Sequence, residues 1–294
     1  MYSNKYSSPL GDKLQNKIKP TISLNLCAWS DLLGFGSHFT KNNWKLSEKE
    51  WQKVTDRLDL FYKIHSRYFS DLNGFMFVLN DGVIKTHFLE KVSKENSINI
   101  LHGIELWIRN IVMAHISILE EEVSNKFPGA RTVIAFGEKS EYSFSEARID
   151  DFVLNYTRPK DGFSNIAKGT GNPIIISNPK ELQMNTALAK AYILDDMGSK
   201  KGIGGSSLYI DESVLIFITQ LVKMSNIITI NKSDTEEGEL ISFEYTEEFE
   251  RPWLFGLLID KEINIDEEII KTNVYKIKAY YPNDEHPDEF RFEL

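Results

Sequence analysis

The sequence predicts an α+β fold with a ferredoxin-like β-α-β-β-α-β core and a β-rich C-terminal extension. Three observations support this fold class. Strand-like and helical patterns follow one another in that order between residues 21 and 137, an Asn80-Asp81-Gly82 turn joins the two central strands, and four strand-like segments follow residue 225. In such a core the first strand lies beside the hairpin of the two central strands.

Length and composition agree with a globular protein. A chain of 294 residues with 41% hydrophobic and 26% charged residues can bury a full core. The single cysteine, Cys27, lies in an apolar run, so we expect a small core residue and no disulfide. The sequence shows neither an apolar signal core nor the roughly 18 uninterrupted apolar residues of a membrane span. We therefore expect a cytoplasmic protein without membrane association.

Charge is distributed unevenly along the chain. The formal net charge is −9, and residues 234–294 carry 18 acidic and six basic side chains, a balance of −12. This acidic part argues against a nucleic-acid surface there. Residues 1–233, with a balance of +3, can accept an anionic small molecule without strong repulsion.

The first half of the core begins with a buried strand and continues into a helix. Apolar residues from 21 to 29 predict the strand, and Gly34 and Gly36 end it. Ser47 followed by Glu50 is a capping-box signature. The apolar residues that follow recur every three or four positions to residue 69, as on one face of an amphipathic helix.

The second half of the core is a hairpin, a long helix and a strand. Residues 74–79 and 83–89 are the two strands of the hairpin. Residues 97–125 predict a long helix that is apolar on much of its circumference and should lie across a sheet. Pro128-Gly129 ends the helix, and residues 130–137 predict the next strand.

The remaining elements are less regular. Residues 145–180 are irregular and punctuated by glycine, with one short strand at 174–176. Further helices are expected over 182–197 and from Asp211 to about residue 224, and strands over the ranges 208–210, 226–231, 239–246, 253–259 and 273–281. We interpret residues 1–20 as a tail, 21–225 as one domain, and 226–294 as an extension packed on it.

Two aspartates form a candidate metal pair. Asp31 ends the first apolar strand, and Asp81 lies between the two strands of the hairpin. The predicted order of strands places both at neighbouring strand ends, where two carboxylates can hold Mg²⁺ ions against a triphosphate. Each aspartate also has a structural interpretation, because Asp31 can cap a helix after the glycine turn and Asp-Gly favours a tight hairpin.

Three motifs resemble those of the class III adenylate and guanylate cyclases. Ser30-Asp31-Leu32-Leu33-Gly34-Phe35 is similar to that family's first-strand signature, and Asn80-Asp81-Gly82-Val83 to its hairpin motif. Residues 131–137, which begin with Arg131, resemble its next strand, with Val and Ile where the family has Ile and Gly. The resemblance covers about residues 21–215 and implies that family's core fold.

The resemblance also implies a metal-dependent reaction on a nucleoside triphosphate. In that family two Mg²⁺ or Mn²⁺ ions are bound by the two aspartates, and the product is a 3′,5′-cyclic nucleotide with release of pyrophosphate. Carried over, the ligands are Asp31, Asp81 and the carbonyl group of Leu32. The backbone N–H groups of Leu33, Gly34, Phe35 and Gly36 would hold phosphate oxygens.

Further residues follow from the same resemblance. The family carries an Asn and, four residues later, an Arg that reach across a homodimer interface to stabilise the transition state. Asn185 fits the first position, but Ala189 stands at the second and the cation is Lys190, one residue later. Lys lacks the bidentate fork of Arg. Lys200 and Lys201 would add positive charge for phosphate binding, and Arg131 is expected to have a structural or interface pairing role.

The compact layout resembles the bacterial pyrimidine cyclases of anti-phage signalling, which make cCMP or cUMP. A homodimer is implied, with the product sensed by a separate effector. Two alternatives stay open: a catalytically degenerate module that keeps the cyclase fold to bind a nucleotide or a protein, and a structural partner in a defence complex. For Asn185, Lys190, Lys200 and Lys201 the alternative is an ordinary polar role on a helix or loop.

Overall fold

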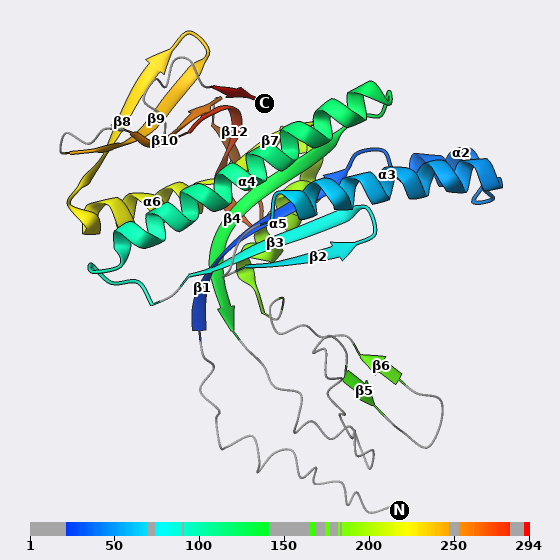
Figure 1. Ribbon diagram of the computed structural model, residues 1–294, viewed down its shortest axis with the longest axis horizontal. Helices are drawn as coiled ribbons and strands as arrows, with labels where there is room; N and C mark the ends of the chain where they lie inside the picture. The colour runs from blue at the N-terminus through cyan, green and yellow to red at the C-terminus, as the bar shows by residue number, and fades with distance from the viewer. Residues whose placement is uncertain are drawn as a thin grey trace, which may run out of the picture. The chain divides into compact units, whose positions relative to one another are not determined.

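The structure of the chain is a computed structural model (Figure 1). The structure describes residues 22–69, 74–89, 91–140, 165–167, 174–176, 182, 184–246, 253–260, 262–282 and 291–294. The chain divides into two compact units. The smaller comprises Met1–Ile22 and Ser140–Met184, and its described strands, β5 (Asn165–Ala167) and β6 (Ile174–Ile176), form an antiparallel pair. The larger comprises Ser23–Lys139 and Asn185–Leu294. The predicted tail and most of the irregular segment 145–180 lie outside the described residues.

The larger unit holds five described α-helices and a large mixed sheet. The helices are α2 (Ser37–Lys41), α3 (Glu48–Arg67), α4 (Ser97–Ser124), α5 (Thr186–Met197) and α6 (Glu212–Ser225), with a 3₁₀ helix at Gly198–Lys201. The strands of the core are β1 (Ile22–Leu32), β2 (Gly74–Leu79), β3 (Gly82–Leu89) and β4 (Ala130–Ser140). The later strands are β7 (Leu208–Asp211), β8 (Ile228–Thr235), β9 (Gly238–Tyr245), β10 (Trp253–Ile259), β11 (Ile263–Asp266), β12 (Lys271–Tyr281) and β13 (Phe292–Glu293).

The order of the strands confirms the predicted ferredoxin-like core. The sheet runs β2-β3-β1-β4-β7-β12-β10-β9-β8, with β11 and β13 also paired to β12. The segment β1-α3-β2 leaves room for β3 between its two strands, and β3-α4-β4 leaves room for β1, as two interleaved β-α-β units require. β3 pairs antiparallel with both β1 and β2. Beyond the core, β4 pairs parallel with β7, and the C-terminal strands continue the same sheet.

Helices α3 and α4 cover one face of the core sheet. The capping box predicted for α3 is present, because the Ser47 Oγ accepts from the Glu50 N–H and the Glu50 carboxylate accepts from the Ser47 N–H. The buried face of α3 packs with Leu32 of β1 in one apolar cluster. The long helix α4 crosses the sheet, as expected, and its apolar side enters the main core (Figure 1).

Helix α5 lies against the opposite face of the core sheet. Successive side chains of a strand point to opposite faces, so Trp29 and Asp31 point away from the face that Leu32 shares with α3. The Trp29 side chain contacts α5 through Asp195 and Tyr192. In Figure 1, α5 accordingly lies behind the strands while α3 and α4 lie in front of them.

Several element boundaries differ from the predictions. The helix predicted over 182–197 begins at Thr186, because the Asn185 side chain caps it and Met184 has a positive φ of 43°. β8 runs to Thr235 rather than 231, since its exposed polar end still pairs with β9. The short strands β11 and β13 and the short helix α2 were not predicted as separate elements.

Candidate active site

The sheet brings Asp31 and Asp81 together at one end of β1 and β3. Asp31 pairs with Gly82, the residue after Asp81, in the antiparallel register of these strands. The Leu32 N–H also donates to the Asp81 carbonyl oxygen over 3.0 Å. Asp81 itself lies in the two-residue turn between β2 and β3, where Asn80 adopts a φ of +54° that suits a tight hairpin. The two carboxylates therefore come from neighbouring backbone positions on adjacent strands.

The surroundings of Asp31 disfavour the ionised form of its carboxyl group. Burial, followed by the nearby carboxylates of Asp195 and Asp81, raises the pKa of the Asp31 carboxyl to about 7. The guanidinium groups of Arg131 and Arg57 lower the same pKa, but they do not offset the rise. A divalent cation would supply the positive charge that these carboxylates lack.

The donor set fits Mg²⁺ or Mn²⁺ that keeps other ligands for a substrate. Asp31, Asp81 and the Leu32 carbonyl offer oxygen atoms only, which these ions prefer, and too few of them to complete a coordination shell. Within the part of the chain that the structure describes, no group of three or more His, Cys, Asp or Glu side chains is arranged to hold a metal ion. Any metal at this pair would therefore take further ligands from substrate phosphates or water.

The turn after β1 is fixed by a buried arginine. The Arg57 Nη2 donates to the Leu33 carbonyl oxygen over 2.9 Å, and the same guanidinium forms an ion pair with Glu122 of α4. Both of these charged side chains are buried. The Leu33 N–H donates to the Gly129 carbonyl oxygen, and the Phe35 N–H lies 3.4 Å from the Leu32 carbonyl oxygen.

Of the four backbone N–H groups expected to bind phosphate, two are engaged in these bonds and two are not. The Leu33 and Phe35 N–H groups already have acceptors, the carbonyl oxygens of Gly129 and Leu32. Among the described residues, none accepts a hydrogen bond from the N–H of Gly34 or Gly36, and both glycines are exposed. Gly34 adopts a φ of +65°, which favours glycine at this position.

Asp195, which lies beside the site, was not predicted from the sequence. Asp195 of α5 is buried, and its Oδ2 accepts from the Trp29 Nε1 over 3.1 Å while its Oδ1 accepts from the Arg131 Nε. The expected pairing role of Arg131 is thus a contact with α5. The available signal was the pattern of α5, because Ala187, Ala191 and Leu194 are buried and Asp195 continues the same face.

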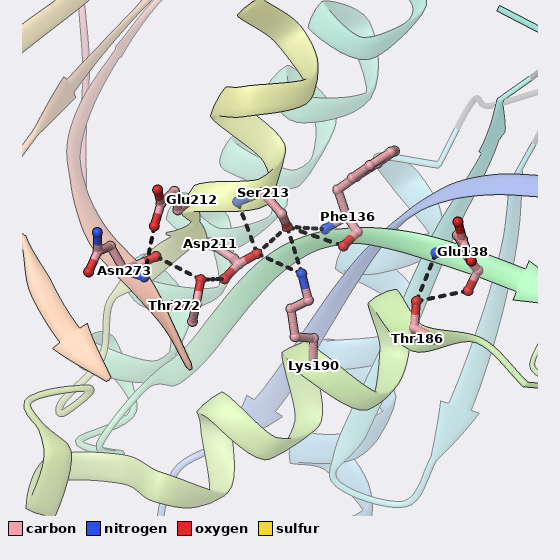
Figure 2. Close-up of polar contacts among 9 residues, drawn as sticks. All are labelled: Phe136, Glu138, Thr186, Lys190, Asp211, Glu212, Ser213, Thr272 and Asn273. Carbon is pink, nitrogen blue, oxygen red and sulfur yellow. Dashed lines mark hydrogen bonds and ion pairs between the residues drawn. The ribbon is translucent and has the colours of Figure 1, made fainter. Parts of the chain in front are cut away.

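Asn185 and Lys190 each make contacts away from the two aspartates, and Figure 2 shows those of Lys190. The Lys190 Nζ lies 3.2 Å from the Asp211 Oδ1 and 3.0 Å from the Ser213 Oγ. Asp211 is fully buried, caps α6 and accepts a further bond from Thr272. The Asn185 Oδ1 caps α5 by accepting from the Leu188 N–H.

Lys200 and Lys201 lie on the 3₁₀ helix after α5. Lys201 forms an ion pair with Glu267, and both lysines border a surface pocket of about 420 Å³. The other lining residues are Asp196, Met197, Glu267, Glu268 and Ile269. Neither Asp31 nor Asp81 lines this pocket, so it does not join these lysines to the aspartates.

None of the described helices has the length and apolar character to cross a bilayer.

Searches against protein families and curated proteins found no match. The solved structures that this chain resembles include three cyclases. The guanylyl cyclase Cya2 has 9% sequence identity and a TM-score of 0.44, covering 93% of this chain and 98% of its own. The adenylyl cyclase CyaB from P. aeruginosa has 11% identity and a TM-score of 0.34, covering 88% and 96%. The dimeric guanylyl cyclase domain of the RhoGC fusion protein from the aquatic fungus Blastocladiella emersonii has 9% identity and a TM-score of 0.37, covering 87% and 97%.

Proposed function

We propose that the chain is a nucleotidyl cyclase that converts a nucleoside triphosphate into a 3′,5′-cyclic nucleotide and pyrophosphate. The observation that carries this proposal is the placement of Asp31 and Asp81 at the paired ends of β1 and β3. It is supported by the three motifs, which follow one another in the order of the cyclase core and occupy the strands β1, β3 and β4 of that core.

Asp31, Asp81 and the Leu32 carbonyl would hold two Mg²⁺ or Mn²⁺ ions. When bound, such ions neutralise the triphosphate charge and make the ribose 3′-hydroxyl a better nucleophile. The protein's part is to keep the two carboxylates fixed and partly shielded from water. The raised pKa of Asp31 fits this role, since a buried carboxylate beside two others gains most from a bound cation.

The turn at Leu33–Gly36 would hold phosphate oxygens through the N–H groups of Gly34 and Gly36. Arg57 holds this turn in place from behind, through the Leu33 carbonyl. In the reaction, the 3′-oxygen forms a bond to the α-phosphorus, the bond from that phosphorus to the bridging oxygen breaks, and pyrophosphate leaves. The hydroxyl proton passes to water, and the turn keeps the triphosphate in line for the attack.

In this proposal the enzyme is a homodimer, and Asn185 and Lys190 act on the substrate held by the partner subunit. Each would exchange an intramolecular contact for one with substrate: Asn185 its cap on α5, and Lys190 its ion pair with Asp211. Lys200 and Lys201 would add charge near the leaving pyrophosphate. Size-exclusion chromatography with light scattering tests the dimer, and mixing inactive Asp31 and Asn185 variants should restore part of the activity.

The substrate base is proposed to be cytosine or uracil, with the product serving as a second messenger that a separate effector senses in anti-phage defence. This part rests on the resemblance of the compact layout to the bacterial pyrimidine cyclases. It predicts turnover of CTP or UTP and little turnover of ATP or GTP.

The test is an assay of all four triphosphates with Mn²⁺ and with Mg²⁺, and with cyclic products separated by chromatography. We expect one cyclic product from the wild type and at least a 100-fold loss in Asp31→Asn and Asp81→Asn, the usual scale for removal of a group acting on the transition state. Asp59→Asn, which removes an exposed carboxylate from α3, is the matched control and should keep full activity. A folded dimer that forms no cyclic product from any triphosphate would refute the proposal.

A second candidate is a catalytically degenerate module that binds a nucleotide without turning it over. The observation in its favour is that Lys190 is engaged with the fully buried Asp211, while the exposed Ala189 stands where the related motif has Arg. Calorimetric binding of a triphosphate that needs no metal, persists in Asp31→Ala and leads to no product would favour this candidate.

A further inference from the structure

Asp195 lies beside the candidate site and is held by hydrogen bonds from two side chains. Its Oδ1 accepts from the Arg131 Nε, its Oδ2 accepts from the Trp29 Nε1 over 3.1 Å, and its backbone carbonyl accepts from the Arg131 Nη2 over 2.8 Å. The residue is only 7% exposed. A carboxylate with a donor on each oxygen cannot rotate without losing a buried hydrogen bond, which fixes its orientation.

The indole of Trp29 connects the fixed Asp195 side chain to the β2–β3 hairpin. A Cβ atom added to Gly82 would lie 2.4 Å from the Trp29 Cη2, so the ring packs directly on the backbone of Gly82. The other side of the ring meets Tyr192 of α5 edge-on, with the ring centroids 5.3 Å apart. Trp29 therefore lies between α5 and the turn that carries Asp81.

The same indole stands next to both proposed metal ligands. Asp31 follows Trp29 by two positions on β1, and two positions along a strand share one face of the sheet. Asp81 immediately precedes Gly82, on which the ring rests. A shift of the indole would thus move the turn that carries Asp81 relative to the strand that carries Asp31.

We infer that Asp195 is a positioning residue, which sets the spacing of Asp31 and Asp81 by holding Trp29 against Gly82. The inference rests on the proposed function, because it assigns the two aspartates a shared metal site. Asp195 acts from behind that site, through the Trp29 N–H, and is balanced by the positive charge of Arg131. Partners of this sort behind metal ligands are often worth a factor of 10 to 100 in metal affinity.

The test measures Mn²⁺ binding in the presence of a non-hydrolysable triphosphate, by electron paramagnetic resonance of free Mn²⁺. We expect Asp195→Ala and Trp29→Phe each to weaken Mn²⁺ binding by about 10- to 100-fold. The double variant should bind Mn²⁺ little more weakly than the single variant with the lower affinity, because both substitutions interrupt the same chain of contacts. Asp195→Asn keeps an oxygen that can accept from the indole, so it should retain more affinity than Asp195→Ala. Asp196→Ala removes the neighbouring exposed carboxylate and is the matched control, with affinity within twofold of wild type.

Hydrogen exchange of the β2 and β3 amides gives a second readout that needs no metal. Faster exchange around Gly82 in Asp195→Ala, with the rest of the sheet unchanged, supports positioning of the hairpin. Wild-type exchange together with wild-type Mn²⁺ affinity in Asp195→Ala would overturn the inference. Uniformly faster exchange across the sheet would also overturn it, since that result marks Asp195 as a stabiliser of the whole fold.

The outcomes separate this inference from the proposed function. If the wild type makes no cyclic product while Asp195→Ala still loosens the hairpin and weakens Mn²⁺ binding, the proposed function fails and the positioning role stands. If the wild type makes product and Asp195→Ala matches it in Mn²⁺ affinity and exchange, the positioning role fails and the function stands. A wild type that binds no Mn²⁺ with triphosphate present overturns both.

Discussion

Leu32 and Asp81 are joined by a hydrogen bond of 3.0 Å from the N–H of one to the carbonyl oxygen of the other. This bond closes the end of the β1–β3 pair beyond the register position that matches Asp31 with Gly82. The backbone therefore fixes how far apart the two aspartates can be before any metal is present. A site that is preorganised in this way holds its carboxylates close at a cost to stability.

The first prediction concerns that cost. Burial and neighbouring carboxylates raise the pKa of Asp31 to about 7, so the folded protein favours its protonated form and is destabilised as the pH rises from about 4 through about 7. Asp31→Asn removes the charge and should raise the free energy of unfolding in metal-free buffer at pH 8 by about 1 kcal/mol. The gain should shrink towards pH 4. Urea denaturation at several pH values measures it, with Asp59→Asn as the control.

Divalent ions should make the wild type more stable than Asp31→Asn, the reverse of the order in metal-free buffer. Saturating Mn²⁺ with a triphosphate analogue stabilises only a protein that binds it, so the wild type should gain stability and Asp31→Asn should not. Equal gains in both proteins would show that the ion binds elsewhere.

The second prediction concerns buried basic groups between the sheet and its helices. Lys85 of β3 donates to the Tyr68 carbonyl oxygen over 3.1 Å, and burial lowers the pKa of its ammonium to about 7. Burial lowers the pKa of His65, and the charge of Lys85 contributes to the same shift. The unfolded chain holds the Lys85 proton up to about pH 10.4, so the free energy of unfolding should rise with pH between about 7 and 10, by up to about 1.4 kcal/mol per pH unit.

Lys85→Met should flatten this alkaline slope. Lys91→Met, at an exposed position just after β3, should leave it unchanged. On the acid side, burial lowers the pKa of His115 to about 3, so its contribution to stability falls as the pH drops below about 6.5, opposite in sign to the contribution of Asp31 in that range. Guanidinium titrations from pH 4 to pH 10 test both limbs, and a slope that persists in Lys85→Met would contradict the assignment.

The third prediction concerns the ion pair that supports the turn after β1. Arg57→Met leaves the buried carboxylate of Glu122 without its partner and frees the Leu33 carbonyl, so the loss of stability should reach about 3–5 kcal/mol. Adding Glu122→Gln should recover much of this loss, because the unpaired charge is then gone. The double variant should still bind triphosphate weakly, since the turn lacks its arginine. Denaturation and calorimetry of the set separate the two effects, and tight triphosphate binding by the double variant would contradict the role given to Arg57.

The fourth prediction concerns Lys190. Its ion pair compensates the fully buried Asp211, so Lys190→Met should lower the free energy of unfolding by about 1–3 kcal/mol, and Asp211→Asn in the same chain should restore part of it. If Lys190 also acts on substrate, the double variant will be stable but slow, with kcat reduced more than KM is raised. A stable double variant with wild-type turnover would assign Lys190 to the fold alone.

The sequence was sufficient to predict the core because its signals are local. The capping box at Ser47, the turn at Asn80-Asp81 and the period of α4 each specify one element, and the order of elements then leaves one place for β1, beside β3. The meeting of Asp31 and Asp81 followed from that order. It needed no knowledge of side-chain packing.

The contacts of α5 could not be predicted in the same way. Whether Asp195 meets Trp29, or Lys190 meets Asp211, depends on how α5 is rotated and placed on the sheet, which is decided by packing over the whole unit. Helix α5 also begins later than predicted, because the Asn185 side chain caps it there although the apolar pattern starts earlier. The short strands β11 and β13 form only by pairing with β12 and have no pattern of their own.

The most direct test of the central claim is a crystal structure with a non-hydrolysable triphosphate and Mn²⁺, read by anomalous scattering. The account predicts Mn²⁺ within coordination distance of the carboxylates of both Asp31 and Asp81 and against the phosphates, and its loss in Asp31→Asn. A bound triphosphate whose metal lies away from these two side chains, or carboxylates too far apart to share one ion cluster, would contradict it.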